Sequence, residues 1–145
     1  MNNVYYCNKL MLIIALSVLF WIPSFVAHSS SCEPYLISNA QLTDILKRNI
    51  GNAPLTNAKA IASKDNKCNV ELGADFISSH ISGCATPIHS DFEIGLSNII
   101  LEGFGQKIKL NDSVTNIKAD IIKHCGTTLP IRELHTDDSG VFVIF

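Results

Sequence analysis

The chain has 145 residues, 47% of them hydrophobic, and its formal net charge is −2 because 13 acidic residues face 11 lysines and arginines. A nucleic-acid-binding surface needs concentrated positive charge, but the basic residues here occur as isolated pairs such as Lys47-Arg48 and Lys107/Lys109. We therefore expect no nucleic-acid partner.

Residues 1–29 have the features of a signal peptide. An apolar run over residues 10–22 follows a basic residue, and Ala27-His28-Ser29 is the small-x-small pattern that signal peptidase accepts. The run is shorter than the roughly 20 apolar residues of a membrane-spanning helix. An uncleaved anchor, or a lipid anchor on Cys32, is the less favoured alternative. We expect a single secreted domain over residues 30–145, extracellular or periplasmic, with no stable membrane span after signal cleavage.

Four cysteines remain after this segment: Cys32, Cys68, Cys84 and Cys125. An even number in an exported chain indicates two disulfides. Three pairings are open, one of which joins Cys68 to Cys84 and Cys32 to Cys125. The alternative is a zinc site that combines these thiols with His80, His89 or His124. It is disfavoured because no CxxC or HxxxH spacing is present and the compartment is oxidising.

The first expected element is a helix over residues 38–51. Ser38 or Asn39 is its candidate N-cap, and Gly51 ends it. Its apolar residues recur at helical spacing: Leu42, Ile45, Leu46 and Ile50.

A second helix is expected within residues 55–72, beginning at Thr56 or Asn57. Its inward side chains would be Ala60, Ile61, Cys68 and Leu72. Residues 74–83 are ambiguous between a helix end and an irregular segment. Residues 91–105 fit a helix or a pair of strands equally well.

A third helix is expected over residues 112–124, with Asp112 or Ser113 as its N-cap. Its inward residues would be Val114, Ile117, Ile121 and Ile122, and Lys123 and His124 would lie favourably at its C-terminus. The β-branched and aromatic segment 140–145 predicts a buried strand paired with residues 129–134. The sequence thus predicts a mixed α/β domain, with about three helices packed on a small sheet and two disulfides.

Several polar motifs have simple structural interpretations. His89-Ser90-Asp91 contains the residue types of a hydrolase triad, but adjacent residues point in different directions and no G-x-S-x-G motif is present. His89 is expected in a solvated loop, and His124 at a helix C-terminus. Asn111-Asp112-Ser113 is a glycosylation acceptor sequence, which matters only in a host that glycosylates.

A series of short motifs suggests a family. Arg48, Gly51 and Pro54-Leu55-Thr56 precede a segment rich in small residues, and CATPIHSD (84–91), SNIILEGF (97–104), His124 and SGVFVIF (139–145) follow in order. Together they resemble a degenerate, short bacterial-like form of the CAP superfamily, the cysteine-rich secretory, antigen 5 and pathogenesis-related proteins. The resemblance implies an α-β-α sandwich.

The family has a cleft tetrad of two His and two Glu that can hold a divalent metal. By resemblance, His89 and His124 match the histidines, whereas Ser97 stands at one acidic position and Asp120 is the sole carboxylate near the other. Two imidazoles without anchoring carboxylates bind a metal weakly. We therefore expect no cofactor, no retained catalytic tetrad and no enzymatic activity.

Two functional hypotheses from different classes follow. The first is a secreted CAP-like binding module for a lipid or protein partner, with EIGLSNIILEGF (93–104) lining a groove. The alternative is a small secreted, disulfide-stabilised inhibitor or effector of unrelated fold that acts through a protein surface. A small exported enzyme is a third reading, and no catalytic constellation in the sequence supports it.

Overall fold

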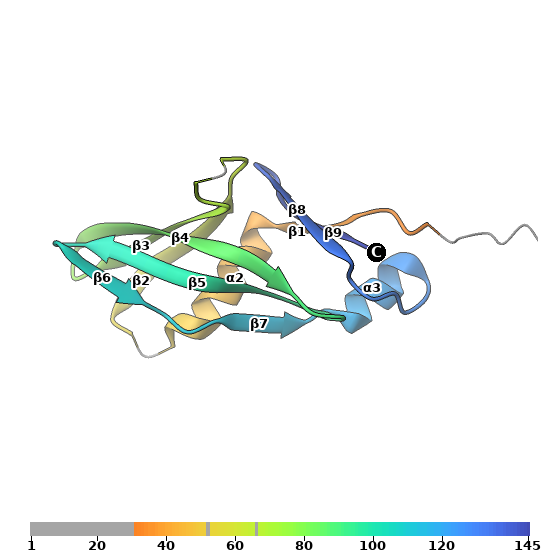
Figure 1. The fold of residues 1–145 in the computed structure, drawn as a ribbon. Helices are drawn as coiled ribbons and strands as arrows, with labels where there is room; N and C mark the ends of the chain where they lie inside the picture. The colour runs from red at the N-terminus through yellow and green to blue at the C-terminus, as the bar shows by residue number, and fades with distance from the viewer. Residues whose placement is uncertain (1–30, 52, 66) are drawn as a thin grey trace, which may run out of the picture. The chain divides into compact units, whose positions relative to one another are not determined.

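The structure is a computed structural model that describes residues 31–145 except Asn52 and Asn66. Its elements are β1 (Tyr35–Ser38), α2 (Asn39–Ile50), β2 (Leu55–Ala62), β3 (Val70–Phe76), β4 (Ser79–His89), β5 (Glu93–Gly103), β6 (Gln106–Lys109), β7 (Ser113–Asn116), α3 (Lys118–Cys125), β8 (Glu133–Asp137) and β9 (Gly140–Ile144) (Figure 1). The expected signal peptide lies outside the described residues.

The strands form two antiparallel sheets. A six-stranded sheet has the order β2-β3-β4-β5-β6, and β7 pairs with the first part of β5. A three-stranded sheet has the order β1-β9-β8. Helix α2 packs mainly against β2, with further contacts to β1, β5 and β7.

The expected α/β fold, with three helices on a small sheet as an α-β-α sandwich, is wrong. The described residues contain two helices, and strands make up 52% of them. The fold is mostly β because two of the segments assigned to helices pair as strands instead.

The first expected helix is confirmed as α2. Ser38 is its N-cap and forms a capping box with Gln41: the Ser38 hydroxyl accepts from the Gln41 backbone N–H, and the Gln41 side chain accepts from the Ser38 N–H. The four apolar residues predicted to face inward are all buried: Leu42, Ile45, Leu46 and Ile50. They anchor the helix to the sheet.

The second expected helix is wrong, because residues 55–62 form β2 and residues 70–76 form β3. Ala58, Ala60 and Ala62 are buried while the residues between them are exposed, which is the two-residue period of a strand. Alanine favours helices in isolation. Here pairing with β3 and packing against α2 outweigh that preference.

The two ambiguous segments are strands. Residues 74–83 contain the end of β3, a two-residue turn and the start of β4. Residues 93–103 form one long strand, β5, with β4 on one side and β6 and β7 on the other. The side chains of Leu96, Ile99 and Leu101 are completely buried, so they belong to the core.

The third expected helix is wrong in its first half. Residues 113–116 form β7, and α3 begins only at Lys118. Val114, expected to face inward, is 53% exposed, because β7 pairs with Gly95 and its neighbours at the sheet edge. Neither Asp112 nor Ser113 caps the helix. The Ser113 hydroxyl instead donates to the Ile45 carbonyl of α2, 2.9 Å away.

The C-terminal hairpin is confirmed. β9 lies between β1 and β8, and its Val141 and Val143 side chains are completely buried. The expected strand before the turn begins later than predicted, at Glu133.

Both predicted disulfides are present, with the pairs Cys32–Cys125 and Cys68–Cys84. One joins the segment before β1 to the end of α3, and the other joins the loop before β3 to β4. All four thiols of the alternative zinc site are therefore oxidised, which fits an oxidising compartment. Neither helix of the described region is long and apolar enough to cross a membrane.

Candidate functional site

The four cleft residues suggested by the sequence lie on three elements. His89 is the exposed last residue of β4, opposite Ile94. Ser97 lies on β5 and is only 9% exposed, and its hydroxyl donates to the Thr86 carbonyl at 3.4 Å. The Ser97 hydroxyl is therefore engaged with the backbone of the sheet.

His124 and Asp120 both belong to α3. The Nε2 of His124 is 3.0 Å from the carbonyl oxygen of Glu33, and its ring centroid is 5.2 Å from that of Tyr35. Asp120 lines a small pocket of about 140 Å³ with Arg48 and Thr115. Over residues 31–145, apart from the two undescribed positions, no three His, Cys, Asp or Glu side chains are grouped to hold a metal ion.

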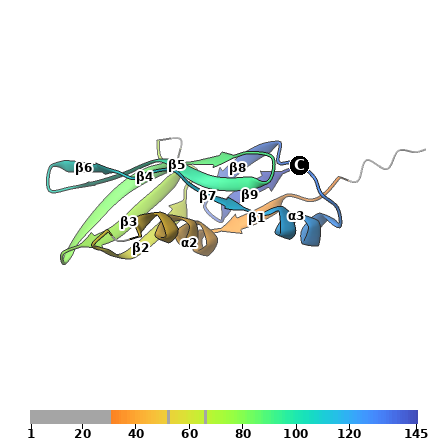
Figure 2. The same cartoon turned by 90° about the horizontal axis from the view of Figure 1, so that it is seen from below.

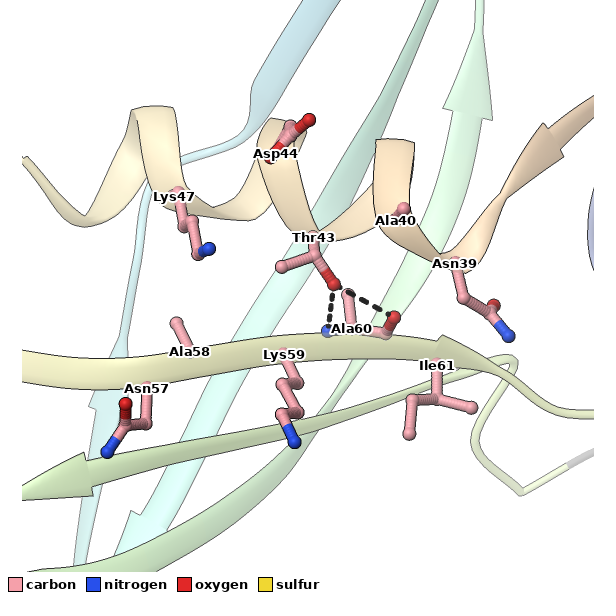
Figure 3. Close-up of a pocket in the computed structure, with 10 residues that line it drawn as sticks. All are labelled: Asn39, Ala40, Thr43, Asp44, Lys47, Asn57, Ala58, Lys59, Ala60 and Ile61. Carbon is pink, nitrogen blue, oxygen red and sulfur yellow. Dashed lines mark hydrogen bonds between the residues drawn. The ribbon is translucent and has the colours of Figure 1, made fainter.

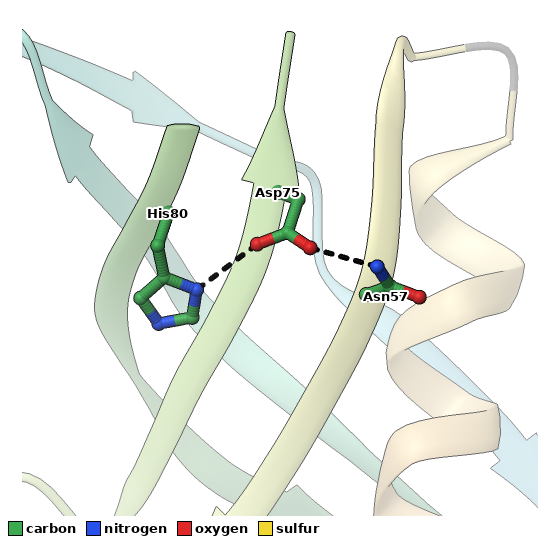
Figure 4. Close-up of polar contacts among 3 residues, drawn as sticks. All are labelled: Asn57, Asp75 and His80. Atoms are coloured by element: carbon green, nitrogen blue, oxygen red, sulfur yellow. Dashed lines mark hydrogen bonds and ion pairs between the residues drawn. The ribbon is translucent and has the colours of Figure 1, made fainter. Parts of the chain in front are cut away.

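A polar cluster not anticipated from the sequence spans three strands (Figure 4). The Nδ1 of His80 lies 3.1 Å from one oxygen of Asp75, and the Asn57 amide donates to the other oxygen at 2.7 Å. The Asn57 hydrogen bond, and secondarily the His80 contact, hold the pKa of Asp75 below its ordinary value.

This cluster lies on an open surface, because the His80 side chain is 71% exposed. From the sequence, His80 is a candidate only for the alternative zinc site, and Asp75 is not a candidate for any site. Recognition of the β3–β4 hairpin would have found the pair, since Asp75 and His80 are directly opposite across the strands.

A groove of about 460 Å³ lies between α2 and β2 (Figure 3). At its base, the Thr43 hydroxyl accepts from the Ala60 N–H at 2.9 Å and donates to the Ala60 carbonyl at 3.3 Å. The Asn39 side chain accepts from the Ala62 N–H at 2.8 Å. Side chains of α2 thus form hydrogen bonds with backbone groups along the outer edge of β2.

Two hairpin turns carry exposed apolar side chains. Ile77 and Ser78 connect β3 to β4 with φ values of 45° and 66°, and Phe104 and Gly105 connect β5 to β6 with values of 53° and 72°. Ile77 is 76% exposed and Phe104 is 69% exposed. Positive φ at both central positions is the geometry of a type I′ turn, which strongly prefers Asn-Gly.

These two turns, which we call the turn pair, lie at the same end of the six-stranded sheet. Ser82 near the start of β4 pairs with Glu102 near the end of β5, so the turn before β4 and the turn after β5 are neighbours along the sheet. Figures 1 and 2 both show them at one end of the sheet.

The backbone at the turn pair is unfavourable for its residues. A β-branched residue such as Ile77 adopts a left-handed conformation only rarely, and each such residue costs roughly 1–3 kcal/mol. The sequence gives no sign of a turn at Ile77, because no Gly or Asn marks that position.

Comparison with family models, with curated proteins and with solved structures finds no match for this chain. The CAP resemblance and the cleft of His89, His124, Ser97 and Asp120 stay predictions from short motifs.

Proposed function

We propose that the protein is a secreted, disulfide-stabilised binding domain that recognises another protein through the turn pair. The observation that carries this proposal is the exposure of Ile77 and Phe104 on neighbouring turns, each in a left-handed backbone conformation. Large apolar residues that protrude from strained turns contribute little to the fold. Such residues do suit pockets on a partner, where aromatic and aliphatic anchors supply most of the binding energy.

The rigidity of these turns favours a protein over a lipid partner. Two-residue hairpin turns fix the direction of the side chains they carry. A fluid lipid surface gains nothing from that fixed geometry, whereas a protein with preformed pockets does. The groove-lining role expected for residues 93–104 has little support, since Leu96, Ile99 and Leu101 are buried in the core.

Secretion and a non-enzymatic role are parts of the same proposal. The two disulfides support an oxidising environment, and the apolar run at residues 10–22 supports export. The Asp75–His80 pair near the turn pair is open to solvent, since the His80 side chain is 71% exposed, so water would not be excluded from a reaction there.

Site-specific photo-crosslinking tests this proposal. A photo-reactive amino acid is placed at position 77, 104 or 114 of the protein secreted by its own host. Val114 is a matched control because it is an exposed apolar strand residue outside the turn pair. We expect positions 77 and 104 to capture the same protein and position 114 not to capture it.

Competition completes the test. Excess wild-type protein should suppress the crosslink, and an Ile77→Asn/Phe104→Asn variant whose melting temperature is no lower than that of the wild type should not. Equal suppression by both proteins, or equal capture from position 114, would show that the turn pair is not the recognition surface.

A further inference from the structure

The two edges of the six-stranded sheet differ in their backbone accessibility. At the β2 edge, Thr43 and Asn39 of α2 bind the N–H and carbonyl groups of Ala60 and the N–H of Ala62 (Figure 3). At the opposite edge, β6 pairs with β5 and with no other strand of the described residues, and all four of its residues are exposed. The edge next to Phe104 is therefore the open one.

The hairpin register shows which groups face this open edge. Gly103 pairs with Gln106 across a two-residue turn, and such a closing pair exchanges hydrogen bonds. The Leu110 N–H also donates inward, to the Ile99 carbonyl at 2.9 Å. Since donors alternate along an antiparallel strand, the N–H and carbonyl groups of Lys107 and Lys109 point outward.

The side chains of β6 specify which strand fits beside it. Lys107 lies opposite Glu102, with 2.8 Å between Nζ and Oε1, and Lys109 lies opposite Ile100. A second copy of β6 would bring lysines close to lysines, which is unfavourable. An acidic strand would place carboxylates beside them, which is favourable.

We propose that β6 binds an extended, acidic segment of the protein partner and adds it to the sheet as a further strand. This inference rests on the proposed function, because the Phe104-Gly105 turn directly precedes β6 and would contact the same partner. Backbone hydrogen bonds to Lys107 and Lys109 supply the pairing, and alternating acidic and apolar side chains of the segment face the lysines and Ile108 respectively.

A random-peptide library displayed on phage is the probe. It is panned on the secreted, oxidised protein. We expect enriched peptides with Asp or Glu at every second position, which shift the amide NMR signals of Lys107 and Lys109. Replacing both lysines by Gln should weaken peptide binding at least about tenfold, whereas a Lys47→Gln/Lys59→Gln control at the β2 edge should not.

Backbone pairing is tested separately. N-methylation of alternate residues of an enriched peptide should abolish binding, because it removes the donors of one edge. The inference is overturned if no peptide is enriched, or if enriched peptides bind the Lys107→Gln/Lys109→Gln variant equally well. It is also overturned if they tolerate N-methylation in both registers. In each of these cases, the lysines of β6 would serve only to prevent edge-to-edge association of sheets, as lysines on short edge strands do.

The two proposals fail in distinguishable ways. If position 104 captures a partner but no acidic peptide binds β6, recognition through the turn pair is supported and the addition of a strand at β6 is rejected. If acidic peptides bind β6 but positions 77 and 104 capture no partner, the proposed function of the turn pair is rejected.

Discussion

Asn57 links backbone geometry to electrostatics at the scale of single residues. Its φ is 50°, and the pairing of β2 with β3 shifts register between Thr56 and Lys59, on either side of it. Asn adopts left-handed conformations more readily than most residues. At this irregularity the Asn57 amide donates to the Asp75 carboxylate, although Thr56 is the residue that pairs with Asp75.

The lowered pKa of Asp75 predicts an acid-dependent loss of stability. Because the folded-state pKa is below the ordinary 3.8, Asp75 stabilises the fold above pH 3.8 and loses this contribution as pH falls through the folded-state value. We expect the melting temperature of Asp75→Asn to fall less steeply below about pH 4 than that of the wild type. Equal slopes would assign the acid sensitivity to other carboxylates.

The two partners of Asp75 should contribute unequally. Asn57→Gly keeps the left-handed backbone but removes the amide, and His80→Ala removes the imidazole. The Asn57 hydrogen bond is the larger cause of the shift, so Asn57→Gly should raise the Asp75 midpoint more, as measured by the ¹³C shift of its carboxyl group. A larger effect of His80→Ala would reverse this ranking.

At the scale of elements, the sequence predicts those parts whose signals are local. The N-cap and apolar spacing of α2 and the aromatic, β-branched C-terminal strand are both local, and both are found. β2 could not be predicted in this way, because its alanines favour a helix until β3 and α2 are in place. The same holds for β7, whose pairing partner is some 20 residues away at β5.

The turn pair could not be predicted from the sequence, also for a physical reason. A hairpin turn is recognised by Gly, Asn or Asp, and the β3–β4 turn has Ile77-Ser78 instead. Where turn chemistry departs from the preferred residues, local rules fail, and such departures tend to mark function.

Replacing Ile77-Ser78 by Asn-Gly should therefore separate stability from binding. Asn-Gly suits a type I′ turn. Because the change removes the backbone strain of Ile77 in a left-handed conformation, it should raise the free energy of unfolding by about 1–2 kcal/mol. Urea denaturation measures this gain, and photo-crosslinking from position 104 measures the expected loss of partner capture. A destabilised variant would mean that Ile77 contributes packing to the fold.

The contact between α2 and the β2 edge yields a second prediction. Thr43→Val keeps the side-chain shape but leaves the Ala60 N–H and carbonyl without the hydroxyl. The free energy of unfolding should fall by about 1–3 kcal/mol, and the exposed edge should promote association of folded protein at high concentration. Thr136→Val, on β8 at the edge of the other sheet, is the control for a Thr-to-Val change in a strand.

At the scale of the whole molecule, one of the two disulfides connects parts that the sheets leave separate. Cys68–Cys84 lies within one sheet region, where β3 and β4 already pair. Cys32–Cys125 joins the segment before β1 to α3, near the contact of His124 with the Glu33 carbonyl. The second bridge therefore holds together elements that lie far apart in the sequence.

Removing the two bridges separately should destabilise the domain unequally. The bridges close loops with sequence separations of 93 and 16 residues, and the loop-entropy relation gives about 4.6 and about 3 kcal/mol for them. Cys32→Ala/Cys125→Ala should accordingly lower the free energy of unfolding by about 1.5 kcal/mol more than Cys68→Ala/Cys84→Ala. Urea denaturation of the two double variants measures this difference, and alkylation of the wild type before and after reduction verifies that all four thiols begin oxidised. An equal or larger loss from Cys68→Ala/Cys84→Ala would mean that the short bridge stabilises the folded sheet directly, since loop entropy alone cannot reverse the order.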